Sequence, residues 1–309
     1  MPRVIALTEC PVCSSGDSEQ LELVGGARLR RCRGCSAVHA AEYADPSEVY
    51  VEGYFKGETD FGLDSAHPGF QAYLAGVAQQ RMEHLERITR GPGRLLDVGA
   101  GMGEVMVGAR VRGWTVQGVE PLAEAATATR ETHGLDVITA TLEESGLPER
   151  SFDAVTAYHV LEHIPEAREF LATMARWARP GGHVAVEVPN FDSALRRHTC
   201  SGWSGLRPLE HVTHFTPASL EDAFRRAGLE PVSVETPSYV GPPQSLEQAL
   251  WDLGKPQWER FVAPLGSRRD NGGTRVPSAL GWRVVHGMDA VSRRRGAGQV
   301  VVGIGRVPG

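Results

Sequence analysis

The sequence predicts an α/β protein, with a doubly wound, seven-stranded sheet behind a small cysteine-bearing ribbon. Two observations lead to this fold class. Short β-branched runs alternate with helical stretches between residues 94 and 306, which is typical of a parallel sheet with crossover helices. Two Cys-x-x-Cys pairs lie within residues 10–35. With 309 residues, the chain is long enough to bury a sizeable core.

Composition and charge narrow the class of protein. The formal net charge is -6, which disfavours nucleic acid as the main partner, because a phosphate backbone rewards a basic surface. No apolar run approaches the roughly 20 residues that span a bilayer, so we expect no membrane insertion. Residues 1–13 are too short for a signal-peptide core and lack a small-residue cleavage site, so we expect a cytoplasmic protein.

Four of the five cysteines form two pairs, Cys10 with Cys13 and Cys32 with Cys35. Two short turns at this spacing direct four thiolates to one point, which is the all-sulfur tetrahedral arrangement of structural zinc. A cytoplasmic setting disfavours disulfides, and the segment is too short for a core of its own. Four thiolates leave no open position on the ion. We therefore predict a structural Zn²⁺ in a ribbon that spans residues 1–45.

A linker and an N-terminal helix follow over residues 46–90. Apolar residues recur at helical spacing from about residue 67 to residue 89, and Gly91-Pro92-Gly93 ends the helix. Residues 91–309 form the sheet domain. Its predicted strands are Arg94–Val98, Thr115–Glu120, Val137–Ala140, Phe152–Tyr158, His183–Val188, Pro231–Glu235 and Gln299–Arg306.

The stretch RLLDVGAGMGEV, residues 94–105, marks a ligand-binding turn. Asp97, Gly99, Gly101 and Gly103 lie where the first strand meets the first helix, and ligands of doubly wound sheets bind beyond the carboxyl ends of the strands. Glycines let the backbone lie against a ligand, and the helix N-terminus favours an anionic group. Glu120 ends the next strand, where a carboxylate can accept both hydroxyls of a ribose. The spacing G-A-G-M-G departs from the G-x-G-x-x-G of dinucleotide enzymes, which disfavours nicotinamide.

At these residues the chain resembles the class I S-adenosylmethionine-dependent methyltransferases, with LLDVGAGMG as the first cofactor motif and VEP as the second. The resemblance continues through ATLEESGLP, SFDAVTAYHVLEHIP and RPGGHVAVEVPN, and it covers roughly residues 94 to 235. It implies a Rossmann-like methyltransferase sheet whose last strand is the reversed edge strand. It also implies S-adenosylmethionine as the cofactor.

The same resemblance implies which residues contact the cofactor. The glycine turn lies near the methionine part, and the acidic residue after the second strand holds the ribose. The pair of residues after the third strand flanks the adenine, and the histidine after the fourth lines the pocket above the sulfonium. The expected cofactor-binding residues are Asp97, Gly99, Gly101, Glu120, Thr141, Leu142 and His159.

The stretch HVLEH, residues 159–163, also matches the H-x-x-E-H signature of inverted zinc peptidases. That signature needs an uninterrupted helix. Here the two histidines follow a strand-like segment and precede Ile164-Pro165, and proline disfavours helical geometry in the residue before it. We therefore expect Glu162 and His163 to hold the loop at the strand end rather than to bind a metal.

A second histidine group, EHVTHF at residues 210–215, precedes a predicted helix that starts near Thr216-Pro217. In many small-molecule methyltransferases this stretch lies beside the open face of the cofactor. A histidine can accept a proton at neutral pH, so His211 or His214 is the candidate general base, and His159 is a further candidate catalytic residue. The alternative is a histidine that caps the helix or bonds to the backbone.

The ribbon ahead of such a core, together with EHVTHF, also resembles the bacterial sugar C-methyltransferases that act on nucleotide-linked ketosugars. Those proteins have an additional C-terminal domain and an EHxxYF pattern. This chain has His214 where the tyrosine would be, and residues 238–309 are too few for that domain. We interpret residues 238–298 as a lid-like insertion between the last two strands. Trp251, Trp258 and Trp282 could cover a substrate there or pack onto the core.

Three functions remain open at this point. The leading one is methyl transfer from S-adenosylmethionine to a carbon, oxygen or nitrogen atom of a small metabolite, in natural-product biosynthesis. The second is modification of an RNA or a peptide that docks on the ribbon. The third is a regulatory module that binds the cofactor without turnover.

Overall fold

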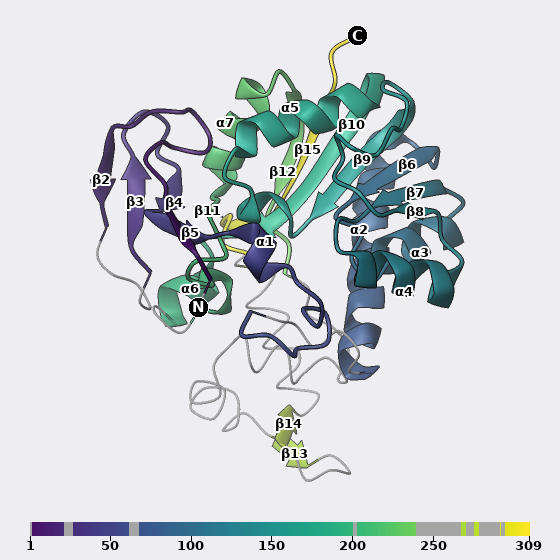
Figure 1. The fold of residues 1–309 in the computed structure, drawn as a ribbon, viewed down its shortest axis with the longest axis horizontal. Helices are drawn as coiled ribbons and strands as arrows, with labels where there is room; N and C mark the ends of the chain where they lie inside the picture. Colours follow the sequence, from purple (N-terminus) through teal and green to yellow (C-terminus); the bar gives the residue numbers. More distant parts are fainter. Residues whose placement is uncertain are drawn as a thin grey trace.

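A seven-stranded sheet forms the centre of the molecule (Figure 1). The structure is a computed structural model that describes residues 2–21, 27–61, 68–199, 203–238, 267–269, 275–277, 291 and 294–309. The strands of this sheet are β6 (Arg94–Val98), β7 (Thr115–Val119), β8 (Val137–Ile138), β9 (Phe152–Tyr158), β10 (Ala178–Pro189), β12 (Glu230–Glu235) and β15 (Val300–Arg306). Their order is β12-β15-β10-β9-β6-β7-β8. The predicted fold class is confirmed, although β10 begins at Ala178 rather than at His183.

The last strand, β15, runs antiparallel to both of its neighbours, whereas the strands from β10 through β9, β6 and β7 to β8 are parallel. Its predicted reversed direction is confirmed. Its predicted place at the sheet edge is wrong, because β15 lies between β10 and β12. Residues 300–305 are buried, so their backbone groups need partners along both edges. A Cβ at Gly303 would lie 2.4 Å from the Phe224 ring, so the helix above approaches closely.

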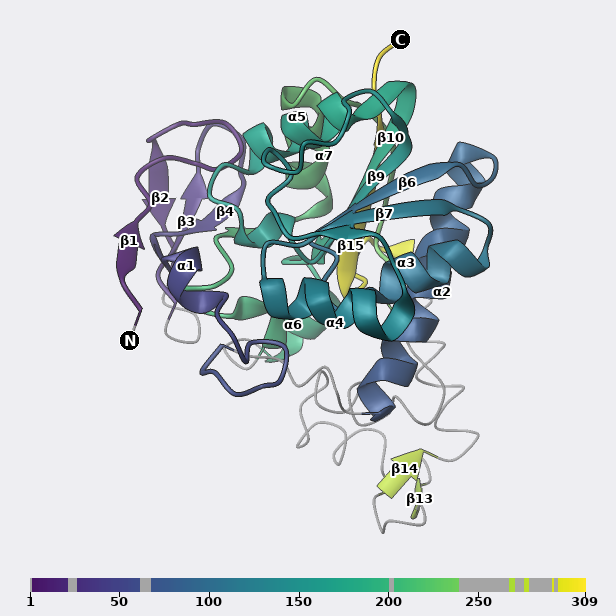
Figure 2. The same ribbon diagram turned by 45° about the vertical axis from the view of Figure 1, so that its right-hand side comes forward.

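Helices cover both faces of the sheet. On one face α2 (Pro68–Thr89) packs against α3 (Glu104–Val111), and α4 (Ala123–His133) lies beside β8. On the other face α5 (Ala167–Trp177) packs against α7 (Pro217–Arg226), and Figures 1 and 2 show the two layers from two directions. Thr216 caps α7 by accepting a hydrogen bond from the Ser219 amide, and Pro217 lies in the first turn.

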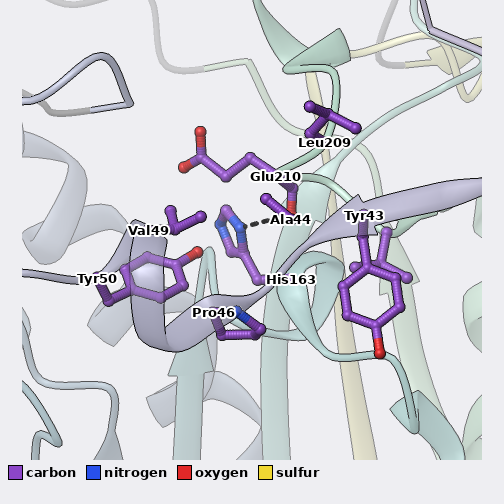
Figure 3. A pocket seen from close by; sticks show the side chains of 9 residues that line it. Tyr43, Ala44, Pro46, Val49, Tyr50, His163, Leu209 and Glu210 are labelled. Carbon is purple, nitrogen blue, oxygen red and sulfur yellow. Dashed lines mark hydrogen bonds between the residues drawn. The ribbon is translucent and has the colours of Figure 1, made fainter. Parts of the chain in front are cut away.

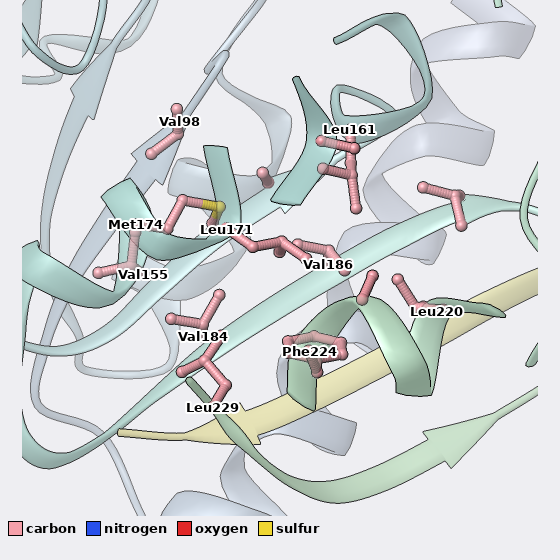
Figure 4. Packing of buried hydrophobic residues seen from close by; sticks show 14 of the residues in the cluster. Val98, Val155, Leu161, Leu171, Met174, Val184, Val186, Leu220, Phe224 and Leu229 are labelled. Carbon is pink, nitrogen blue, oxygen red and sulfur yellow. The ribbon is translucent and has the colours of Figure 1, made fainter. Parts of the chain in front are cut away.

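Successive side chains of a strand point to opposite faces of the sheet, so the apolar residues form two cores, one on each face. Val184 and Val186 of β10 point toward α5 and α7, where they share a core with Phe224 (Figure 4). Ala185, between them, belongs to the opposite core, together with Met82 of α2. The helix predicted over residues 67–89 is thus present, and its apolar stripe faces the sheet.

The N-terminal part forms two small antiparallel sheets from β1 (Val4–Ala6), β2 (Ser18–Gln20), β3 (Leu29–Cys32), β4 (Val38–Ala40) and β5 (Glu42–Ala44). The sheet of β2, β3 and β4 continues into β11 (Thr213–His214), which comes from the large domain and pairs with β4. The Ala40 amide also donates to the Val212 carbonyl at 2.8 Å. The ribbon is therefore attached along the stretch that contains the candidate bases.

Shorter elements complete the chain: α1 (Pro46–Val49), the single-turn helices η1 (Leu161–His163) and η3 (Ser204–Leu206), α6 (Ala194–Thr199), and the hairpin of β13 (Ser267–Arg269) with β14 (Arg275–Pro277). Most of the predicted lid, including Trp251, Trp258 and Trp282, lies outside the described residues. Within the described part of the chain, no helix is both long and apolar enough to cross a bilayer.

Candidate active site

The glycine turn after β6 is shaped by close packing. Gly99, Gly101 and Gly103 have φ angles of 70°, 52° and 85°, in the left-handed region that favours glycine. A Cβ at Gly99 would lie 2.6 Å from Val160, and one at Gly103 would lie 2.5 Å from a threonine of α4. At Gly101 the nearest group is the Phe55 ring, at 3.6 Å. Gly101 is thus the least tightly packed of the three glycines, and among the described residues its only neighbour within 4 Å is the side chain of Phe55.

Asp97, near the end of β6, is buried, and its Oδ1 accepts a hydrogen bond from the Thr156 hydroxyl at 2.7 Å. Burial raises the pKa of this carboxyl to about 7. A cation beside such a group favours its ionised form, and the α-ammonium group of S-adenosylmethionine is a cation. Asp97 therefore fits the methionine end of the cofactor.

Glu120 follows β7 and turns its carboxylate back toward the glycine turn. Its Oε2 accepts from the Gly101 amide at 2.9 Å, and its Oε1 accepts from the Leu122 amide at 2.9 Å. The residue is 5% exposed, and burial raises the pKa of its carboxyl. Each oxygen keeps a further lone pair, so the carboxylate can also accept two hydroxyl groups from a ribose that lies on Gly101. The residue fits the role that the resemblance implies.

Thr141 and Leu142 follow β8, at the same end of the parallel strands as the glycine turn. Thr141 is exposed, and its hydroxyl donates to Glu144 at 3.1 Å. Leu142 is buried in the core beside Val98 and Val119. The fold brings both residues to the expected edge of the sheet, but of the two only Thr141 is open to solvent.

His159 follows β9 and has a φ of 57°, an uncommon backbone conformation for a residue with a side chain. Its Nδ1 donates to Glu162 Oε1 at 3.1 Å, and its Nε2 donates to Glu187 Oε1 at 3.2 Å. Desolvation alone would lower the pKa of the ring, but the two carboxylates outweigh it and raise the pKa to about 9. His159, with a side chain 44% exposed, therefore presents a cation at neutral pH rather than a free base.

Arg81 and Glu187 form a buried ion pair below this histidine, and sequence reasoning missed both. The Arg81 Nε donates to Glu187 Oε1 at 3.2 Å, and the guanidinium lies over the Tyr158 ring at 4.6 Å. Burial would raise the pKa of Glu187, but Arg81 and His159 hold it at about 2. The sequence around Arg81 predicts only the apolar stripe of α2. It does not predict that a charged side chain of this helix pairs with a carboxylate on β10.

The connection of residues 45–61, predicted only as a linker, reaches from the glycine turn to the EHVTHF stretch. The Phe55 ring lies against Gly101, and the Tyr54 hydroxyl donates to Glu210 Oε1 at 2.7 Å. The backbone of the same segment donates to Glu124 of α4 at 2.7 Å. The aromatic residues of VYVEGYFKG were the available signal that this segment packs on the site.

His211 and His214 are buried and line a cavity of about 190 Å³ between the ribbon and residues 208–214. Its other lining residues are Ala27, Arg28, Leu29, Ala40, Glu42, Pro208 and Leu209. The His211 Nδ1 donates to the Gly205 carbonyl at 2.9 Å. Burial lowers the pKa of both imidazoles, that of His214 to about 3, so both rings are neutral at pH 7. The ribbon thus supplies one wall of a cavity whose opposite wall carries the candidate bases.

The fold also brings His211 next to the HVLEH loop. The His163 and His211 rings meet edge to face, with centroids 4.6 Å apart. The His163 Nδ1 donates to the Glu210 carbonyl at 3.2 Å (Figure 3). One side-chain ligand atom from each of Glu162, His163 and His211 lies within 4.8 Å of the others. The loop itself forms the single turn η1 and not an α-helix.

Four cysteine sulfurs converge in the ribbon, as predicted. The Sγ atoms of Cys10 and Cys35 lie 3.5 Å apart, and those of Cys13 and Cys32 lie 3.4 Å apart. Thiolates on one tetrahedral zinc ion, with bonds of about 2.3 Å, lie roughly 3.8 Å from one another. The donor set and its spacing therefore fit a structural zinc ion.

The sheet domain is similar to known proteins. A methyltransferase domain family matches residues 70–234. The ubiquinone biosynthesis O-methyltransferase of Marinobacter nauticus is 31% identical over 166 residues, which cover 47% of this chain and 67% of that protein. The protein of the same name from Cronobacter sakazakii is 34% identical over 137 residues, which cover 42% of this chain and 54% of that protein. The chain thus spans about half to two thirds of the length of these relatives.

Two solved structures are similar at lower identity. The 1,6-didemethyltoxoflavin-N1-methyltransferase of Burkholderia thailandensis is 19% identical, with a TM-score of 0.49, over 94% of this chain and 100% of that chain. A methyltransferase from Archaeoglobus fulgidus is 18% identical, with a TM-score of 0.48, over 75% of this chain and 94% of that chain. The family match itself covers more than half of the sequence and includes the glycine turn, Glu120 and the HVLEH loop. The chain therefore belongs to the methyltransferase domain family and is a class I S-adenosylmethionine-dependent methyltransferase.

Proposed function

We propose that the protein methylates a hydroxyl oxygen of a small metabolite, which binds in the cavity between the ribbon and residues 208–214. This cavity carries the proposal, because its volume of about 190 Å³ is bounded by two neutral imidazoles, those of His211 and His214. A cavity of about 150 Å³ holds one benzene molecule, so the space suits a compound of one or two small rings. The relatives from Marinobacter nauticus and Cronobacter sakazakii are named as O-methyltransferases, which supports an oxygen acceptor.

The residues of the chain hold the methyl donor and take up one proton. Asp97 lies at the methionine end of the proposed cofactor site, and Glu120 lies at the ribose. S-adenosylmethionine supplies a methyl group that is already activated on its sulfonium. We propose that the acceptor hydroxyl gives its proton to His214, with His211 as the alternative base. Burial makes both imidazoles weak bases by lowering their pKa values, so the proton leaves as the oxygen forms its bond to the methyl carbon. The carbon–sulfur bond breaks in the same step, and its electron pair returns to sulfur.

The ribbon side of the cavity supplies polar groups for recognition. The Arg28 Nε donates to Glu42 Oε1 at 3.1 Å, and both residues line the cavity. The guanidinium can donate further hydrogen bonds and the carboxylate can accept them, which suits an acceptor with polar substituents. The ribbon therefore contributes to the choice of substrate in this proposal.

A mass-shift screen tests the proposed function. The purified chain is incubated with S-adenosylmethionine and sets of hydroxylated, amino and carbon-acid compounds of one or two rings. We expect methylation of hydroxyl acceptors. Methylation of amines or carbon acids alone, or of RNA or peptides alone, would contradict the proposal.

A cavity-filling variant locates the acceptor. Ala27→Leu adds volume to the cavity wall, so turnover should fall while the affinity for S-adenosylhomocysteine stays unchanged. Ala172→Leu in α5, outside the cavity, is the matched control and should keep normal turnover. Equal turnover in both variants would place the acceptor elsewhere.

A further inference from the structure

We propose that Glu162, His163 and His211 form a binding site for one divalent transition-metal ion, separate from the four-cysteine cluster. Two imidazoles and one carboxylate are a ligand set that suits divalent manganese, iron, cobalt or zinc. The sequence argued against a metal at HVLEH because the motif is not on a helix. The third residue, His211, reaches the motif only through the tertiary fold.

Both imidazoles are held in the tautomer that a metal ligand requires. The His163 Nδ1 donates to the Glu210 carbonyl at 3.2 Å, and the His211 Nδ1 donates to the Gly205 carbonyl at 2.9 Å. A carbonyl oxygen only accepts, so each Nδ1 carries the proton and each Nε2 keeps a free lone pair. Among the described residues, neither Nε2 has a hydrogen-bond partner. Metal-binding histidines are fixed by such a bond from their other ring nitrogen.

The carboxylate has one oxygen held and one oxygen available. Glu162 Oε1 accepts a hydrogen bond from His159 Nδ1 at 3.1 Å, and the Glu162 side chain is 1% exposed. Its Oε2 is buried without a hydrogen-bond partner in the part of the chain that the structure describes. Buried carboxylate oxygens without a partner are rare, and a bound cation would satisfy this one. The neighbouring Glu210 carboxylate is already used by Arg207 and Tyr54.

The ring geometry fits one shared ion. The His163 and His211 centroids lie 4.6 Å apart, and the ring planes meet at 83°. With metal–nitrogen bonds of about 2.1 Å, two imidazoles on one ion have centroids roughly 4.5–5.5 Å apart for ligand angles between about 90° and 110°, so the separation of these two rings is compatible with a shared ion. The three ligand atoms lie within 4.8 Å of one another, so closing on an ion needs only small side-chain movements.

The backbone around the three ligands is fixed next to the methyl-donor site. The Val212 amide donates to the Glu162 carbonyl at 2.7 Å, which joins the two ligand-bearing segments. Val160, in the same loop, occupies the space where a Cβ of Gly99 would lie. This part of the inference rests on the proposed function. The acceptor oxygen would occupy an open position on the ion, and the ion would lower the pKa of the acceptor hydroxyl. That would ease the proton transfer to His214 and leave His211 as a ligand.

Metal binding by the full chain tests the site. The protein, with its ribbon cysteines loaded with zinc, is dialysed to equilibrium against Mn²⁺ and, separately, against Co²⁺. Mn²⁺ prefers oxygen and nitrogen over thiolates, so it does not compete for the ribbon. Elemental analysis should show about one Mn²⁺ or Co²⁺ per chain beyond any zinc displaced. Uptake of neither ion by the wild-type protein would overturn the proposal.

Variants assign the ligands. Glu162→Gln keeps the shape of the side chain but not its charge, and it should weaken the binding of the ion at least about tenfold. His211→Asn keeps a donor for the Gly205 carbonyl but removes the Nε2 ligand, and it should weaken binding similarly. Glu166→Gln, on the exposed end of the same loop, is the matched control and should bind like the wild type. Wild-type affinity in Glu162→Gln would overturn the site.

A separate readout distinguishes this proposal from the proposed function. Near-ultraviolet circular dichroism and S-adenosylhomocysteine binding should be preserved in both ligand variants, which shows that they are folded. Metal binding at the site without methylation of any hydroxyl acceptor would contradict the proposed function and leave the metal site standing.

Discussion

Glu120 accepts a hydrogen bond from the Gly101 amide at 2.9 Å, which joins the end of β7 to the glycine turn after β6. This bond holds the carboxylate beside the one glycine of the turn at which a Cβ would meet no atom of the described residues closer than 3.6 Å, the Phe55 ring being the nearest group. We propose that the same carboxylate binds the ribose of S-adenosylmethionine, and its two backbone hydrogen bonds would hold it there.

Glu120→Ala should weaken the binding of S-adenosylmethionine and of S-adenosylhomocysteine to the same extent, because both ligands contain the ribose. Hydrogen bonds to a charged group contribute about 1.5–3 kcal/mol, so we expect a loss of roughly 10- to 100-fold in affinity. Calorimetry measures it. Glu131→Ala, at an exposed position of α4, is the control. Unchanged affinity in Glu120→Ala would remove this residue from the ribose.

Cofactor binding should be linked to protonation of Asp97. Its carboxyl has a pKa of about 7 in the free protein, and a nearby ammonium group would favour the ionised form. The ionised fraction grows as the pH rises, so S-adenosylmethionine should bind roughly tenfold more tightly at about pH 8 than at about pH 6. Asp97→Asn should abolish this difference, whereas Asp136→Asn, on the surface, should retain it. A flat pH profile in the wild type would contradict the linkage.

The ribbon should contain one zinc ion with four thiolate ligands. Elemental analysis of the freshly purified chain should find it, and X-ray absorption should give zinc–sulfur distances of about 2.3 Å. Cys32→Ser should remove this zinc and destabilise the ribbon while cofactor binding persists, because the cofactor residues lie in the sheet domain. Cys200→Ser is the control for the loss of a cysteine. Freshly prepared protein without thiolate-bound zinc would exclude the structural role.

The Arg81–Glu187 pair should matter for folding. Its side chains are 8% and 0% exposed, so Arg81→Met leaves a carboxylate buried without its guanidinium. We expect a loss of about 3–5 kcal/mol in the free energy of unfolding, measured by urea denaturation. The double variant Arg81→Met with Glu187→Gln should recover part of it, because no unpaired charge remains. Arg87 is exposed on the same helix, so Arg87→Met should change the free energy of unfolding little. An equal loss of stability in Arg87→Met and Arg81→Met would contradict a specific contribution of the ion pair.

The proposed base predicts a specific kinetic defect. His214→Ala should lower the rate of methyl transfer to a hydroxyl acceptor by roughly 10²- to 10⁴-fold, the usual contribution of general-base catalysis. The affinity for S-adenosylhomocysteine should not change, because His214 is not among the expected cofactor-binding residues and its strand pairs with β4 of the ribbon. His133→Ala at the end of α4 is the control. Normal rates in both His214→Ala and His211→Ala would show that neither histidine is the base.

The fold and the outline of the site were readable from sequence because they depend on local patterns. Apolar periodicity distinguishes strands from helices, so β6, β9 and α2 were predicted with nearly correct bounds. Glycines at every second position after an apolar strand mark a turn with positive φ angles. The Cys-x-x-Cys spacing defines a ligand set by itself, and the four sulfurs do converge. Each of these features is encoded within one short segment.

Only the tertiary structure decided which distant residues meet. The place of β15 between β10 and β12 depends on strand pairing across the whole sheet, which direction and hydropathy alone do not specify. Arg81 meets Glu187 because α2 packs across β10. His211 meets Glu162 and His163 where the Val212 amide bonds to the Glu162 carbonyl and the following strand, β11, pairs with β4. A buried charge or imidazole is stable only beside a partner from another element, and no local pattern specifies that partner.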